Sequence, residues 1–298
     1  MRIKGVTALI IAFAMLESCS RAPSEPTLVQ VIETSTSAET TDDIKESAAS
    51  SDTSLDYKIS EPEVKQFYDI GKELTFFRDG NEIHGRLYIP EKKGPHKTVV
   101  LASPLYCPGS AVEDKAWEFC EKGYAAITFD FQNNVTGDPD MAPKYMGDFV
   151  CEQVKDLLAV LDSLKYLPDV DLDHVFLWGH SMGGLDAAYA GALWRGHIDG
   201  IILVEPSFQH PGKWKFENGA TLTDDMYDLF EKMDIPVLII RGTGSRGGMG
   251  DMEHFYDKAI ESLPKGKIEA IEGADHYMQG RAGEEMVKLS LDFLDSCR

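Results

Sequence analysis

A serine flanked by glycines is the residue whose surroundings most clearly indicate chemistry in this sequence. Residues 179–183 read Gly-His-Ser-Met-Gly, directly after an apolar run predicted as a strand over 174–179 and before a predicted helix over 182–194. A tight turn between them would push the Ser181 hydroxyl out above the sheet, and the glycines leave room for it. The spacing therefore predicts Ser181 as a nucleophile, provided that a base can take its proton.

The rest of the chain shows a regular alternation of strand and helix patterns. Two strands, 73–78 and 83–89, flank the hairpin signal Asp-Gly-Asn. Buried-strand patterns then alternate with amphipathic helix patterns. These strands cover 98–103, 124–131, 174–179, 200–205, 236–241 and 267–272, and the helices cover 111–122, 147–166, 182–194, 252–263 and 282–296. The alternation predicts an α/β class fold, a mostly parallel eight-stranded sheet with helices on both faces.

The motif at residues 179–183, with its strand and its helix, resembles the nucleophile turn of the α/β-hydrolase family. The resemblance extends over residues 58–298 and implies the α/β-hydrolase fold, without a large cap because the connections are short. Residues 207–234 hold no strand pattern and leave two interpretations open, an ordinary helical connection or a small lid. The resemblance implies no metal and no organic cofactor.

In this family the general base is a histidine in the loop after the last strand. His276 occupies that place, in the segment Ile-Glu-Gly-Ala-Asp-His over 271–276. Asp275 adjoins His276 directly, so we do not expect its side chain to orient the histidine ring. His180 belongs to the turn at Ser181, where we expect it to pack rather than to react.

The carboxylate that should orient His276 has two candidates. The family usually places it three or four residues after a glycine at the end of the seventh strand, but Ser245 and Arg246 stand there. Asp251 is the first carboxylate in that loop, although it also precedes a helix, where aspartate is a common N-cap. Glu205, in a Glu-Pro-Ser segment, ends the sixth strand, where some related lipases and phospholipid acetylhydrolases carry their acid. A charge that ends a buried strand needs a partner, and the sequence leaves both candidates open.

An oxyanion hole needs two backbone N–H donors. One should be Met182, which follows the nucleophile. The other should come from the loop over 103–106, which resembles the Ser-Pro-Gly-aromatic loop of polyester-hydrolase and cutinase-type relatives, with Leu105 in place of glycine. Pro104 has no N–H to donate. Tyr106 is therefore the expected second donor, with Leu105 as the next choice.

The first eighteen residues have the pattern of an export signal. Two basic residues precede an apolar run over 6–16, which is too short to span a membrane as a mature helix. The Leu-Glu-Ser-Cys that follows resembles the lipobox of bacterial lipoproteins, although Glu17 departs from its usual small or apolar residue. The resemblance implies a signal peptide over 1–18, cleavage before Cys19 and lipidation of its thiol.

A polar segment links this signal to the globular part. Residues 19–57 are rich in serine, threonine and acidic residues, and such a composition cannot bury enough apolar area to offset chain entropy. We therefore interpret them as a disordered tether to a hydrolase domain over 58–298. A lipid anchor at Cys19 predicts attachment to a membrane on the extracytoplasmic face of a bacterial cell envelope.

The five cysteines leave an even number if Cys19 carries the lipid. In an exported chain an even remainder suggests disulfides, and the fold implied by the resemblance favours Cys120 with Cys297 and Cys107 with Cys151. The alternative is four free thiols. The cysteine spacing does not match a zinc motif.

The net charge limits the partners. The 29 lysines and arginines stand against 50 aspartates and glutamates, a formal charge of −21. This field repels phosphate backbones, so we do not expect nucleic-acid binding. The 298 residues contain no run of about 20 apolar residues, the length that a spanning helix needs.

These features predict a lipid-anchored serine hydrolase that cleaves a small-molecule or polymer-linked ester through an acyl-enzyme on Ser181, as compact carboxylesterases such as feruloyl-esterase or dienelactone-hydrolase-like relatives do. Two alternatives stay open. One is a peptidase or amidase of the same fold, which the sequence does not separate from an esterase. The other is a non-catalytic surface-binding lipoprotein on a hydrolase scaffold, which would have no need of both Ser181 and His276.

Overall fold

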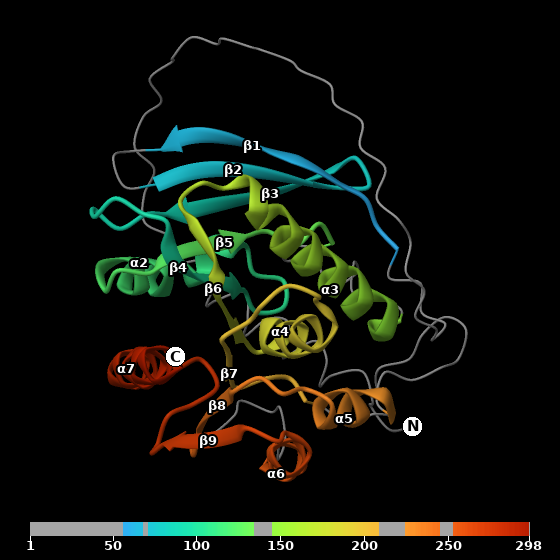
Figure 1. Cartoon of the computed structure of the whole chain (residues 1–298). Helices are drawn as coiled ribbons and strands as arrows, with labels where there is room; N and C mark the ends of the chain where they lie inside the picture. The colour runs from blue at the N-terminus through green and yellow to red at the C-terminus, as the bar shows by residue number, and fades with distance from the viewer. Residues whose placement is uncertain (1–55, 68–70, 134–144, 209–223, 245–252, 298) are drawn as a thin grey trace, which may run out of the picture.

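One sheet runs through the described chain, with helices on both sides (Figure 1). The computed structural model describes residues 56–67, 71–133, 145–208, 224–244 and 253–297. Its strands are β1 (Ile59–Phe67), β2 (Gly71–Arg78), β3 (Asn81–Tyr88), β4 (His96–Ala102), β5 (Ala125–Phe129), β6 (Val170–His180), β7 (Gly200–Val204), β8 (Val237–Gly242) and β9 (Gly266–Ile271). Its helices are α2 (Glu113–Glu121), α3 (Met146–Ser163), α4 (Met182–Leu193), α5 (Asp224–Glu231), α6 (Glu253–Ser262) and α7 (Arg281–Ser296), with 3-10 turns at η1 (Gly109–Val112) and η3 (Leu164–Tyr166).

The strand order places the site. The order is β1-β2-β3-β5-β4-β6-β7-β8-β9. Strands β1 to β3 are antiparallel, and β5, β4 and β6 to β9 run parallel. From β4 the chain goes to β5 on one side, and then to β6 on the other side of β4. Sites in such sheets lie at the carboxyl ends of the strands beside this reversal, and β6 ends at His180, directly before Ser181.

The predicted α/β class and mostly parallel sheet are confirmed, but the predicted eight strands are too few, since nine described strands form the sheet. The missed strand is β1, whose sequence is largely polar. It lies at the edge of the sheet, and its only partner among the described strands is β2, with a register shift between Ser60 and Glu63. An edge strand with proline and charges needs no continuous apolar run, so periodicity did not reveal it.

The two faces of the sheet are buried under different helices. Helices α3 to α6 cover one face, and α2 and α7 cover the other (Figure 1). Strand β6 shows the alternation: Val175 and Leu177 pack with the first group, and Phe176 and Trp178 with the second. Residues 175–179 of β6 are buried on both faces and nearly all apolar, which is why the sequence pattern predicted this part of the strand. The partly exposed residues 171–173 before it lay outside the prediction.

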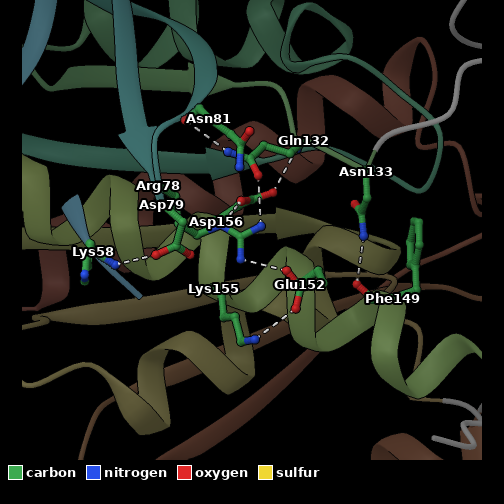
Figure 2. Close-up of polar contacts among 10 residues, drawn as sticks. All are labelled: Lys58, Arg78, Asp79, Asn81, Gln132, Asn133, Phe149, Glu152, Lys155 and Asp156. Carbon is green, nitrogen blue, oxygen red and sulfur yellow. Dashed lines mark hydrogen bonds and ion pairs between the residues drawn. The ribbon is translucent and has the colours of Figure 1, made fainter. Parts of the chain in front are cut away.

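A buried ion-pair network joins the antiparallel strands to the parallel part (Figure 2). At the end of β2, Arg78 Nε lies 2.7 Å from Asp156 Oδ1, and Nη1 donates to Glu152 at 2.7 Å. Its Nη2 donates to Gln132 Oε1 at 2.9 Å, and Gln132 N–H donates to Asp156 Oδ2 at 2.8 Å. Burial raises the pKa of Asp156 to about 7, against the opposing effect of Arg78. The network ties β2, the segment after β5 and α3 together.

Asp186 on α4 is a second buried carboxylate, within electrostatic reach of Asp156. Among the described residues, neither of its carboxylate oxygens has a hydrogen-bond partner. Burial, and then the charge of Asp156, raises the pKa of Asp186 well above its usual value. The folded state thus retains a proton that the unfolded chain loses, and this group makes the folded state less stable as the pH rises.

Replacement of Asp186 by asparagine should remove that pH dependence. Asp186→Asn keeps the size of the side chain and removes its proton equilibrium. We expect the difference in melting temperature, variant minus wild type, to be larger at pH 8 than at pH 5 by about 3 °C or more. Differential scanning fluorimetry at both pH values measures this. The control is Asp257→Asn, an exposed position on α6 with the same charge change. Equal pH dependence in both variants would contradict the burial argument.

The predicted disulfides are not present. Cys120, Cys151 and Cys297 carry free thiols, so neither Cys120–Cys297 nor Cys107–Cys151 forms. Cys120 and Cys297 are both buried in the layer between the sheet and α2 and α7. Free cysteine packs there as a small apolar residue, and burial raises the pKa of the Cys120 thiol to about 11, which keeps it unreactive at neutral pH.

Candidate active site

The turn at Ser181 holds the serine in an unusual backbone conformation. Ser181 has φ 56° and ψ −115°, between the end of β6 and the start of α4. A positive φ is unfavourable for a residue with a side chain, and two backbone hydrogen bonds secure it. Ser181 N–H donates to the Val204 carbonyl at 2.9 Å, and the Ser181 carbonyl accepts from Ser207 N–H at 2.9 Å. This is the tight strand-to-helix turn that the motif predicts.

Two glycines make this turn possible. A Cβ on Gly179 would collide with the carbonyl oxygen of Gly183. A Cβ on Gly183 would collide with the carbonyl oxygens of Ala102 and Ser103. The start of α4 therefore packs directly against the carboxyl end of β4, and any side chain at either glycine would force the turn apart.

The structure brings Ser181, His276 and Glu205 into one line of contacts. Ser181 Oγ lies 3.0 Å from His276 Nε2, and His276 Nδ1 lies 3.4 Å from Glu205 Oε2. The three residues are 0%, 3% and 1% exposed. Their low-dielectric surroundings strengthen the electrostatic interactions among them. A hydroxyl, an imidazole and a carboxylate in this order can move a proton from the serine to the histidine.

Glu205 is held in place from two neighbouring segments. It directly follows β7 with φ 44°, and its N–H donates to the Ile240 carbonyl at 2.8 Å. Gly242 N–H donates to Glu205 Oε1 at 2.5 Å, and the Tyr256 hydroxyl lies 3.4 Å from Oε2. These donors favour the ionised carboxylate. Because Gly242 holds Oε1, Oε2 is the carboxylate oxygen that faces His276.

The loop after β4 approaches the start of α4, where an oxyanion hole would form. Residues 104–107 form a turn that is closed by the Cys107 N–H, which donates to the Pro104 carbonyl at 3.0 Å. Within this turn Tyr106 has φ 60°. The buried Ser103 hydroxyl donates to the Cys107 carbonyl at 2.8 Å. The first N–H groups of a helix have no partner inside it. The two predicted donors, Met182 and Tyr106, lie on segments that meet at Gly183.

Two predicted residues lie outside the described part of the chain. They are Asp251, the other candidate acid, and Cys19, the predicted lipidation site, together with the signal peptide over 1–18 and nearly all of the tether. Glu205 is thus the acid candidate whose position the structure describes.

Sequence reasoning missed several groups that support the site. Ser207 Oγ lies 3.3 Å from Ser181 Oγ, and the residue is buried. Gly242 and Tyr256 hold Glu205, and Ser103 holds the loop of Tyr106. The only signal in the sequence was the position of Ser207 two residues after Glu205. The other contacts depend on tertiary structure.

A family model matches part of the chain. The family model described as Hydrolase_4, serine aminopeptidase, S33, matches residues 93–233, which include Ser181 and Glu205 but not His276. No curated protein sequence matches significantly.

Solved structures share the fold at low sequence identity. A dienelactone hydrolase from Anabaena variabilis has TM-score 0.59 and 17% identity, over 80% of this chain and 99% of the other. An acetyl xylan esterase from Paenibacillus sp. R4 has TM-score 0.59 and 15% identity, over 80% and 88%. Est1E from Butyrivibrio proteoclasticus has TM-score 0.54 and 17% identity, over 80% and 100%. The chain has the α/β-hydrolase fold, as its sequence predicts.

The described helices and side chains meet neither the requirements of a membrane-spanning helix nor those of a metal site. In the segments that the structure describes, the helices are too short or too polar to cross a bilayer. The same segments contain no group of three or more histidine, cysteine, aspartate or glutamate side chains placed to hold a metal ion.

Proposed function

We propose that this protein is a serine hydrolase that cleaves a carboxylic ester, with Ser181 as nucleophile, His276 as general base and Glu205 as the acid that orients the base. The observation that carries the proposal is the line of contacts from the Ser181 hydroxyl through the His276 ring to the Glu205 carboxylate, at 3.0 and 3.4 Å. The strained turn that presents Ser181 adds support, because strain of this kind concentrates at functional sites.

The proposed reaction has two steps. Ser181 Oγ attacks the ester carbonyl carbon while its proton passes to His276 Nε2. The tetrahedral intermediate then collapses, the bond to the alcohol breaks, and the proton on Nε2 passes to the departing oxygen. Water repeats the sequence on the acyl-enzyme, which releases the acid and restores Ser181. Glu205 stays ionised and stabilises the His276 imidazolium in each step.

Negative charge on the substrate oxygen needs donors. We infer that the N–H of Met182 supplies one and the N–H of Tyr106 the other. The support is their position on the two segments that pack at Gly183. Helix α4 begins at this point, and its N-terminus adds favourable potential for an anion.

The choice of an ester rests on the similar structures, which include an acetyl xylan esterase and Est1E, the latter also in a structure with ferulic acid bound. The test is hydrolysis of p-nitrophenyl esters from acetate to octanoate by the fragment from Asp56 onward. Because Ser181 is fully covered, we expect the shortest acyl chains to react fastest. If no ester is turned over and a phosphonate does not label Ser181, the protein is a surface-binding protein that retains the fold without the chemistry.

Amide hydrolysis is the second candidate function. It is favoured by one observation, the match of residues 93–233 to the serine aminopeptidase family. Aminoacyl p-nitroanilides, assayed beside the p-nitrophenyl esters, separate the two. A kcat/KM higher on the anilides than on the corresponding esters would assign the protein to the peptidases, because amides are intrinsically the less reactive substrates.

We also propose that Cys19 carries a lipid that anchors the protein to a membrane of a bacterial cell envelope, on its extracytoplasmic face. The support is the signal-like pattern over 1–18 and the polar segment that follows. In a bacterial host, Cys19→Ala should shift the protein from the membrane fraction to the soluble fraction and abolish labelling with a palmitate analogue. The control is Cys151→Ala, which should change neither readout. A membrane-bound Cys19→Ala protein would contradict the anchor.

A further inference from the structure

The ring of His180 contacts the loop that carries the proposed base. His180 is the last residue of β6 and directly precedes Ser181. Its Nε2 lies 2.7 Å from the backbone carbonyl oxygen of His276, and the two rings are 5.3 Å apart. A carbonyl can only accept a hydrogen bond, so Nε2 carries the ring proton and donates a hydrogen bond to the His276 backbone carbonyl.

The chemistry of His180 suits a fixed donor rather than a second base. Burial, and then the neighbouring His276, lowers the pKa of His180 to about 3, so the ring is neutral near pH 7. A neutral imidazole has one N–H, and the contact with the carbonyl places it on Nε2. The ring therefore adds no positive charge beside His276 and does not compete for the Ser181 proton.

The contact between the His276 ring and the proposed acid is comparatively long. His276 Nδ1 lies 3.4 Å from Glu205 Oε2, whereas a charge-assisted hydrogen bond usually measures about 2.7–2.9 Å. The loop is otherwise held from its flanks, for example by the hydrogen bond from Gly244 N–H to the Ala274 carbonyl at 2.8 Å. The hydrogen bond from His180 links the nucleophile turn directly to the backbone of His276.

We propose that His180 is a positioning residue that couples the turn of Ser181 to the loop of His276 and so maintains the 3.0 Å contact between Ser181 Oγ and His276 Nε2. This inference rests on the proposed function and extends it. Because His180 is joined covalently to the nucleophile and by a hydrogen bond to the base, one side chain sets the distance between the two. Loss of the donor lets the His276 loop move relative to Ser181.

Replacement of His180 by glutamine or by asparagine, whose amide side chains differ in length, tests the role of the hydrogen-bond donor. The side-chain nitrogen of glutamine can reach the place of Nε2, whereas that of asparagine corresponds to Nδ1 and falls short. On a p-nitrophenyl ester we expect His180→Asn to lower kcat by about 10- to 100-fold with KM unchanged, since a misplacement of about 1 Å has an effect of this size. His180→Gln should stay within about threefold of wild type. Equal kcat in the two variants would overturn the proposal, whether both lose activity or both keep it.

A measurement that needs no activity separates this inference from the proposed function. Nitrogen-15 NMR of histidine-labelled wild-type protein should show His180 as the neutral tautomer protonated on Nε2 from pH 5 to pH 8. His180→Asn should shift the ring signals of His276, and His180→Gln should leave them close to wild type. A His180 that titrates within this range, or that carries its proton on Nδ1, would refute the positioning role even if ester turnover is found. Failure of turnover with these NMR results intact would count against the proposed function alone.

Discussion

Ser181→Ala should abolish ester hydrolysis, with a fall in kcat of about 10⁵-fold or more. The substitution removes only the oxygen that lies 3.0 Å from His276 Nε2. Without a nucleophile no acyl-enzyme can form, and His276 has no proton to receive. KM should change little, because the side chain adds almost nothing to ground-state binding. Stopped-time assays of p-nitrophenyl acetate at high enzyme concentration measure the residual rate.

The neighbouring serine provides a matched control. Ser207 Oγ lies 3.3 Å from Ser181 Oγ, and both residues are buried. Ser207→Ala removes this side-chain contact but retains the hydrogen bond from the Ser207 backbone N–H to the Ser181 carbonyl. We expect that variant to keep kcat within about tenfold of wild type, the scale of one neutral hydrogen bond. If Ser207→Ala were inactive and Ser181→Ala active, the two serines would exchange roles and the proposed relay would be wrong.

Glu205→Gln should lower kcat by about 10³- to 10⁴-fold, the effect of removing the charge behind a catalytic histidine in other triads. The amide keeps an oxygen for the Gly242 N–H, so the fold should persist. It removes the negative charge that stabilises the His276 imidazolium and allows an N–H to face Nδ1. The measurement is kcat, together with the melting temperature to confirm that the variant is folded.

The same experiment decides between the two candidate acids. Asp251→Asn should keep kcat within about threefold of wild type, because its expected role as an N-cap affects local stability rather than the proton relay. A large loss in Asp251→Asn with Glu205→Gln almost fully active would assign the acid to Asp251. If both variants kept wild-type rates, neither carboxylate would serve the base.

The local parts of the site could be predicted from the sequence, and the parts that depend on distant contacts could not. The turn at Ser181 is encoded within five residues, since the backbone of Gly179 and Gly183 has no room for a side chain. His276 could be found because its loop follows the last strand. The choice between Glu205 and Asp251 could not be made, because it depends on which loop end lies beside the His276 ring.

The fold shows the same division. The part of β6 that is buried on both faces, residues 175–179, is nearly all apolar and was predicted, whereas residues 170–173, which begin the strand, were not. The edge strand β1 has one paired side and a polar sequence, and was missed. The cysteine pairs failed for a related reason. An even number of cysteines says nothing about whether the side chains meet, and Cys120, Cys151 and Cys297 are free thiols. The donor from His180 to the His276 carbonyl is likewise visible only in three dimensions.

Covalent labelling asks directly whether Ser181 is a nucleophile that His276 activates. The fragment from Asp56 onward would be treated with a fluorophosphonate and analysed by peptide mass spectrometry. We expect one adduct, on Ser181, that is absent in Ser181→Ala and forms far more slowly in His276→Ala. An unlabelled Ser181, an adduct on another serine, or a labelling rate unchanged by His276→Ala would contradict this expectation.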